Sequence, residues 1–252
     1  MLSSMTDPAA PVPNHATELF VGGSSTDLVI TCDHASPHLP APWSWPSTDH
    51  WLADKHWASD LGAALITREL ASRLSCTAAL ARFSRLLVDA NRDLESPTLF
   101  REVAEGRAIA LNQALDDAAR RSRIEQYYVP YHTTIDELVA ARPQAALFSV
   151  HTFTPEYEGQ PRRLEAGVLF TDDDLEARVF ATSLIDQGYD TGLNEPYSGL
   201  DGLMYGIERH ALQHRRRCLE VEVRQDIALD PVRRRHMVDA LERAVRRTLI
   251  PD

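Results

Sequence analysis

The sequence has little cysteine: Cys32, Cys76 and Cys218 are the only three in 252 residues. An odd number of widely spaced cysteines excludes a disulfide framework and a cysteine-rich zinc motif. It fits a reducing compartment, so we expect a cytoplasmic protein. No apolar run approaches the ~18 residues of a membrane span. Residues 1–26 have no basic segment followed by an apolar one, so we expect no signal peptide and no membrane partner.

Positive charge is also scarce. The chain has 26 Lys and Arg against 37 Asp and Glu, a formal net charge of -11, which disfavours a nucleic-acid partner. The arginine clusters at 120–123 and 215–217 are too short for a phosphate track, and we expect them at solvated helix ends or loops. A hydrophobic fraction of 44% and a charged fraction of 25% are ordinary for a globular enzyme. Nothing in the composition indicates an oligomeric state.

The compact metal and phosphate motifs are missing too. The sequence has no His-Glu-x-x-His, no Cys-x-x-Cys and no glycine-rich phosphate loop. Any metal site must therefore be assembled from residues that lie far apart in the sequence.

Short apolar runs alternate with helical periodicity along the chain. This alternation predicts one α/β domain over residues 1–252, with a mostly parallel mixed sheet between two helical layers, α/β/α. The polar, proline-containing N-terminus predicts a loose arm over 1–25. The expected strands are 27–32, 77–82, 86–89, 145–150, 165–171 and 218–223. The expected helices are 52–74, 109–139 with a break near Pro130, 173–188 and 231–249.

Two histidines follow strand-like apolar runs. His34 comes after the run 27–32, and His151 comes after the run 145–150. Ligands of open α/β sheets bind beyond the carboxyl ends of the strands. Two imidazoles delivered there from distant segments predict a metal site, although each histidine taken singly is equally well explained as a loop residue.

The predicted helix 52–74 offers a third ligand. His56 and Asp60 are four residues apart and would share one helix face. Either side chain can complete a set of imidazole and carboxylate ligands with an open position, the pattern of catalytic zinc. We favour Asp60, with His56 as its rival; the alternative is a solvated face that carries both.

Glu222 lies near the carboxyl end of the predicted strand 218–223, on the same face as Glu220. A carboxylate there can act as a general base on a metal-activated water. The alternative is an ordinary edge-strand carboxylate.

Two arginines flank the predicted strand 86–89. Arg85 precedes it, and the pair Asn91-Arg92 follows it. The planar guanidinium matches a carboxylate bidentately, so these residues can hold an acidic substrate, and one arginine can stabilise an oxyanion. The alternative is a set of structural salt bridges.

Seven stretches, in this order, resemble the N-formylglutamate amidohydrolase family: TCDHAS (31–36), DKHWASDLGA (54–63), SRLLVDANR (84–92), YVPYH (128–132), SVHTFTP (149–155), NEPYSG (194–199) and EVRQD (222–226). The resemblance implies a zinc-dependent exopeptidase-like fold. It also implies hydrolysis of the amide bond of a small acidic N-acylated amino acid, such as N-formyl-L-glutamate.

The resemblance also implies roles for individual residues. His34 and His151 correspond to ligands of one zinc ion per chain, with Asp60 or His56 as the third ligand. Glu222 corresponds to the base and Arg85 to the residue that polarises the carbonyl. Asn91 and Arg92 correspond to the pair that holds the substrate carboxylate.

The sequence departs from the family in two places. Asp33 precedes His34 where the deformylases of histidine degradation more often have proline, and His56 stands where they tend to have aspartate. These departures indicate a divergent branch. Two other functions are alternatives: a non-catalytic protein that senses an acidic metabolite in the same pocket, and an amidase of cell-wall peptides, which the lack of an export signal disfavours.

Overall fold

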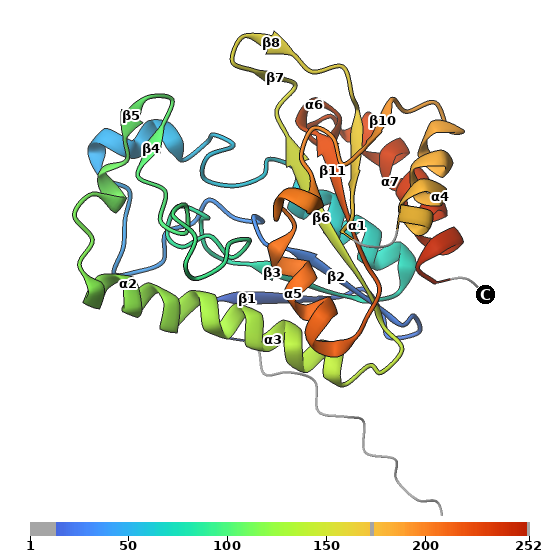
Figure 1. Cartoon of the computed structure of the whole chain (residues 1–252), viewed down its shortest axis with the longest axis horizontal. Helices are drawn as coiled ribbons and strands as arrows, with labels where there is room; N and C mark the ends of the chain where they lie inside the picture. The colour runs from blue at the N-terminus through green and yellow to red at the C-terminus, as the bar shows by residue number, and fades with distance from the viewer. Residues whose placement is uncertain (1–13, 172–173, 251–252) are drawn as a thin grey trace, which may run out of the picture.

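The computed structural model describes residues 14–171 and 174–250. Within these residues seven strands form one sheet (Figure 1). Its order is β1 (Thr17–Val21), β3 (Thr77–Ala81), β2 (Leu28–Cys32), β6 (Ala146–Phe153), β11 (Cys218–Arg224), β9 (Ala166–Leu169) and β10 (Thr191–Leu193). The four central strands β3, β2, β6 and β11 are parallel to one another. Strand β1 is antiparallel to β3, and β9 is antiparallel to β11, which confirms the predicted mostly parallel mixed sheet.

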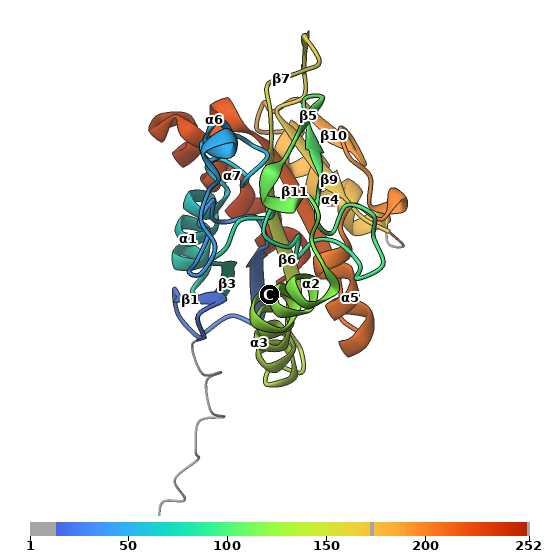
Figure 2. The ribbon, with the colours of Figure 1, turned by 90° about the vertical axis from the view of Figure 1, so that its left-hand side faces the viewer.

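Helices cover both faces of this sheet (Figure 2). One layer consists of α1 (Ala63–Leu74), α4 (Asp174–Ile185), α6 (Gln225–Leu229) and α7 (Pro231–Thr248). The other contains α3 (Val129–Ala140) and α5 (Tyr205–His214), and α2 (Asp117–Arg123) leads into α3 through the π-helical turn Ile124–Tyr128. The predicted three-layer α/β/α architecture is therefore confirmed.

Strand β6 shows why the central strands appear in the sequence as continuous apolar runs. All eight of its residues are buried. Phe148 and Val150 pack with the core beneath α1 and α7, whereas Leu147 packs with the core beneath α3 and α5. A strand covered on both faces needs apolar side chains at successive positions.

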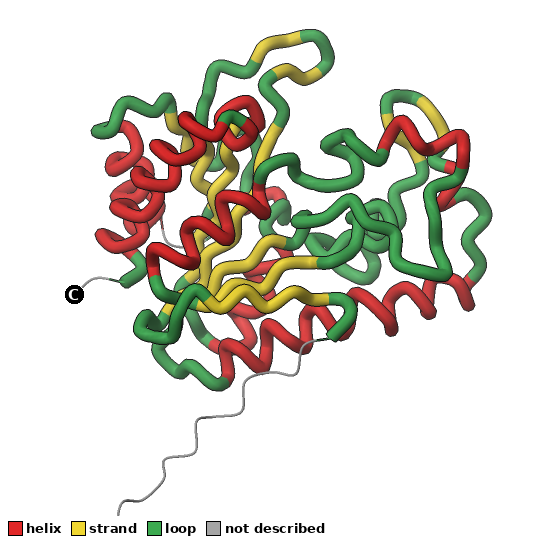
Figure 3. Tube along the Cα trace, turned by 180° about the vertical axis from the view of Figure 1, so that it is seen from behind, coloured by secondary structure: helices red, strands yellow, loops and turns green. Residues whose placement is uncertain are grey.

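Apart from the sheet and the helices that cover it, the chain consists mostly of loops (Figure 3). They include two hairpins, β4–β5 (Val103–Ala104, Arg107–Ala108) and β7–β8 (Glu156–Tyr157, Gln160–Pro161), and the 3-10 turns Ser47–Leu52, Ala110–Asn112 and Gly199–Asp201. No helix in the described part of the chain is both long and apolar enough to cross a membrane.

The predicted loose arm over 1–25 is wrong for the part that the structure describes. Residues 17–21 form β1, which pairs along its whole length with β3 and so closes that edge of the sheet. Leu19 and Phe20 are only partly buried and pack against the cores on opposite faces of the sheet, and Val21 is exposed, so this edge strand has a weak sequence signal. The prediction for residues 1–13 lies outside the described residues.

Two further predictions are corrected. The helix expected over 52–74 begins only at Ala63. Gly62 precedes it with a φ of 88°, in the left-handed region, and a Cβ added at this position would lie 2.6 Å from the Ala228 side chain. The strand expected over 86–89 is a turn that starts with a hydrogen bond from Leu87 N to Ser84 O. Both segments contain buried apolar residues that lie in loops, and their sequence pattern resembles that of a helix or a strand.

Candidate active site

The four parallel strands end at one edge of the sheet, and each contributes to the same site. His34 follows β2, His151 lies near the end of β6, and Glu222 lies near the end of β11. In the register of the parallel pair β6–β11, Glu222 stands opposite His151, so the two side chains point to the same face. The loop after β3 brings Arg85 to this edge.

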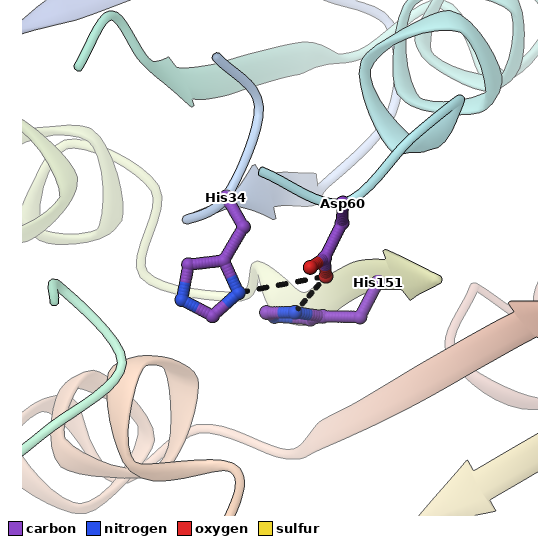
Figure 4. Close-up of side chains that lie close together, drawn as sticks. All are labelled: His34, Asp60 and His151. Carbon is purple, nitrogen blue, oxygen red and sulfur yellow. Dashed lines mark hydrogen bonds and ion pairs between the residues drawn. The ribbon is translucent and has the colours of Figure 1, made fainter. Parts of the chain in front are cut away.

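His34, Asp60 and His151 form a buried cluster (Figure 4). Asp60 Oδ2 lies 2.9 Å from His151 Nδ1 and 3.5 Å from His34 Nδ1. The backbone contributes to this arrangement, because Asp60 N donates to His34 O at 2.9 Å. One potential ligand atom from each of the three residues lies within 4.8 Å of the others.

Each imidazole of this cluster has a second carboxylate on its opposite side. His34 Nε2 lies 2.8 Å from Asp89 Oδ1, and His151 Nε2 lies 3.5 Å from Glu220 Oε2. Histidines that ligate metals commonly donate their other N–H to a carboxylate, which fixes the tautomer and the orientation of the ring. His34 Nε2 makes this hydrogen bond with Asp89, whereas His151 Nε2 and Glu220 form an ion pair without a hydrogen bond. Both rings present Nδ1 toward Asp60.

Burial and charge oppose one another in this cluster. Burial would raise the pKa of Asp60, but His34 and His151 overcome it and hold the pKa below its ordinary value. Burial lowers the pKa of His151, but Glu220 and Asp60 raise it well above its ordinary value. Burial raises the pKa of Glu220 to about 7, against the opposing effect of His151. Burial and the nearby Asp60 also raise the pKa of Glu222 despite His151.

These residues fit a divalent metal ion. Two imidazoles and one carboxylate form a ligand set of catalytic zinc. Several polar atoms around them are buried and have no hydrogen-bond partner within the described part of the chain, among them His34 Nδ1, His151 Nε2, Glu222 Oε2 and both oxygens of Glu220. Buried polar groups normally have partners, so such a concentration indicates a site for an ion.

A cavity of about 210 Å³ opens beside the cluster. His34, Asp60, His151, Arg85 and Glu222 all line it. The cavity therefore brings together the three candidate metal ligands, the candidate base and the candidate carbonyl-polarising residue.

Arg85 is paired on both sides. Its guanidinium contacts Asp89 at 3.0 Å and Asp60 at 3.4 Å. Burial lowers the pKa of Arg85, but these two carboxylates raise it above its ordinary value. The ion pair with Asp89 links Arg85 to His34, because the Asp89 carboxylate also contacts His34 Nε2.

Asn91 and Arg92 both line the cavity, but their side chains have different hydrogen-bond partners. The Asn91 amide donates to Leu203 O at 3.0 Å and accepts from Gly206 N at 2.7 Å, so it ties the loop to the start of α5. Arg92 donates to Asn91 O and Thr98 Oγ1. The geometry makes Arg92 the better placed of the two to contact a ligand.

His56 and Asp60 do not share a helix face, because residues 53–62 form turns ahead of α1. Asp60 reaches the two imidazoles, whereas His56 stacks on Trp57 with ring centroids 4.6 Å apart and lines the cavity outside the cluster. The structure thus groups Asp60, and not His56, with the histidines.

Sequence reasoning missed three residues of this region. Asp89 lies within the SRLLVDANR stretch, four residues after Arg85, so the sequence could have indicated a role for it at the site. Glu220 alternates with Glu222 along β11, but its contact with His151 depends on which strand lies next to β11. Gly206 has no signal in the sequence pattern.

Gly206 is packed tightly against the site, which gives a stability prediction. A Cβ at this position would lie 2.1 Å from Asp33 Oδ2 and 3.3 Å from Asn91 Oδ1. We expect Gly206→Ala to lower the free energy of unfolding by about 1–3 kcal/mol, because overpacking forces α5 away from both side chains. Thermal denaturation measures this; Leu212→Ala, at an exposed position of α5, is the control and should stay within about 0.5 kcal/mol. Equal stability of Gly206→Ala and wild type would contradict the tight packing.

Comparison with known proteins agrees with the fold. Residues 26–229 match the model of the N-formylglutamate amidohydrolase family, so the chain belongs to that family. The fold is similar to the crystal structure of a gene product of Agrobacterium tumefaciens, with a TM-score of 0.87 and 28% identity over 92% of this chain and 94% of that one.

A second solved structure is similar at the level of the fold. It is an N-formylglutamate amidohydrolase from Ralstonia eutropha, with a TM-score of 0.63 and 16% identity over 92% of this chain and 98% of that one. No curated protein matches the sequence.

Proposed function

We propose that the protein is a zinc-dependent amidohydrolase that cleaves the amide bond of a small acidic N-acylated amino acid, such as N-formyl-L-glutamate. One observation carries the proposal: the buried carboxylate of Glu222 stands opposite His151 and opens into the same cavity as the His34–Asp60–His151 cluster. Membership of the N-formylglutamate amidohydrolase family supports the reaction class.

His34, Asp60 and His151 would hold the zinc ion. When bound, zinc supplies a Lewis acid and brings the pKa of water toward neutrality. Asp89 and Glu220 would keep the two imidazoles oriented, since each faces the ring nitrogen remote from Asp60.

Glu222 would carry the proton in both halves of the reaction. It takes a proton from the attacking water, whose oxygen bonds to the acyl carbon, and it returns that proton to the amine nitrogen as the C–N bond breaks. The products are a carboxylic acid and a free amino acid, which are formate and glutamate for N-formyl-L-glutamate.

The arginines would bind and orient the substrate. Arg85, which Asp60 and Asp89 hold at the cavity wall, can donate N–H bonds to the developing oxyanion. Arg92 can receive the α-carboxylate and so align the amide bond with Glu222.

The test is product formation from defined substrates. We expect zinc-loaded enzyme to release formate and glutamate in equal amounts from N-formyl-L-glutamate, and we expect a chelator to stop release until zinc is restored. Formate is measured with a coupled assay, and N-acetyl-L-glutamate and N-formyl-L-methionine define the acyl and side-chain preferences. A zinc-loaded protein that binds these compounds without cleaving any of them would instead be a binding protein.

A further inference from the structure

Arg101 is a cavity residue that no motif of the sequence includes. It lies between the loop after β3 and the β4–β5 hairpin, and it lines the same cavity as Arg92 and Glu222. Its backbone is held in place, because Asn112 Nδ2 donates to Arg101 O at 2.8 Å and to Leu86 O at 2.9 Å. One asparagine thus fixes Arg101 relative to the loop that carries the other arginines.

The side chain of Arg101 is oriented by an aromatic platform. Its guanidinium carbon lies 5.4 Å from the ring centroid of Trp57. The indole is itself tied down, since Trp57 Nε1 donates to Glu105 Oε1 at 3.1 Å. A guanidinium stacked on an aromatic face keeps its in-plane N–H groups for a planar anion.

The charges in the cavity are unevenly matched. Arg85 contacts both Asp60 and Asp89. Within residues 14–171 and 174–250, neither Arg92 nor Arg101 forms an ion pair with a carboxylate. In a chain of net charge -11, two unmatched guanidinium groups beside one reaction centre indicate a ligand with two anionic groups.

The pKa of Arg101 agrees with this imbalance. Partial burial lowers it most, and the neighbouring Arg85 and Arg92 lower it further, while Asp89 and Tyr157 oppose them. An anion bound between the guanidinium groups would relieve their mutual repulsion.

We propose that Arg101 determines substrate specificity by binding the side-chain carboxylate of the N-acylated amino acid, while Arg92 binds its α-carboxylate. This inference rests on the proposed function, because it takes an N-acylated amino acid as the ligand of the cavity. It assigns the preference for an acidic side chain to a residue outside the metal cluster.

The first test compares two substrates that differ only in charge, N-formyl-L-glutamate and N-formyl-L-glutamine. We expect wild type to prefer the glutamate derivative in kcat/KM by about 10- to 150-fold, the range for a hydrogen bond to a charged group. Arg101→Met should remove that preference, mainly by raising KM for the glutamate derivative, with the glutamine derivative almost unaffected. Arg101→Lys should restore part of it.

The matched control is Arg107→Met. Arg107 stacks on Trp51 at 4.2 Å in the same hairpin region but does not line the cavity. This variant should keep the wild-type preference. Equal losses for both substrates in Arg101→Met, or no preference in wild type, would overturn the assignment.

A binding measurement separates this inference from the proposed function. Glutarate carries two carboxylates and has no amide bond, so its binding by titration calorimetry needs no turnover. We expect glutarate to bind wild type and Arg107→Met, and to bind Arg101→Met about 10-fold or more weakly. If no N-acyl amino acid is cleaved, hydrolysis fails as the function, and Arg101 keeps its role only if glutarate binding depends on it. Equal binding by all three proteins, or no binding by wild type, would refute that role.

Discussion

Glu222→Gln is expected to lower kcat by about 10²–10⁴-fold, the usual contribution of a general base. Glutamine keeps the size and position of the side chain but cannot take a proton from water or return one to the amine nitrogen. KM should change little, because the proposed substrate-binding groups are the arginines and not Glu222, which lies in β11. Steady-state kinetics with N-formyl-L-glutamate, on protein of verified zinc content, measures the effect.

The control for this variant is Glu156→Gln. Glu156 is an exposed carboxylate of the β7–β8 hairpin, next to the cavity residue Tyr157, and the substitution removes the same charge. Its activity should match that of wild type. If Glu222→Gln turned over substrate within a few-fold of wild type while retaining zinc, Glu222 would not be the base, and another group would have to carry the proton.

The parts of this site that the sequence predicted are those that local patterns determine. His34 and His151 were recognisable because β2 and β6 are buried on both faces and appear as apolar runs. Strand ends in a parallel sheet gather at one edge, so two such histidines could be expected to meet. Glu222 was recognisable because β11 alternates apolar and charged residues, as a strand does, and ends two residues after Glu222.

The other features depend on tertiary contacts. Asp60 reaches His151 from a turn that is hydrogen-bonded to His34 O, and the apolar periodicity of that region gave the wrong element. The contact of Glu220 with His151 requires β11 to lie beside β6, although the two strands are separated by 64 residues in sequence, from Phe153 to Cys218. Strand order of this kind is set by packing of whole layers and leaves little trace in either segment.

Metal content is expected to fall from one zinc per chain to less than about a tenth of that in His34→Ala and in His151→Ala, since each variant removes one of the three proposed zinc ligands. Asp60→Asn should lose zinc as well, because it replaces the anionic ligand that faces both imidazoles. His56→Ala should retain it, since His56 lies outside the cluster. Elemental analysis of the purified proteins measures all four.

Two further variants make the metal result specific. His236→Ala, on the exposed side of α7, should bind zinc like wild type. Glu220→Gln should still bind zinc but about 10–100-fold more weakly in competition with a chelator, the effect of removing a carboxylate that orients a ligating histidine. If wild type bound no zinc even after zinc was added back, the hydrolytic mechanism would fail. The same buried histidines and unmatched arginines would then form a binding site for an acidic metabolite, and glutarate affinity would become the property to measure.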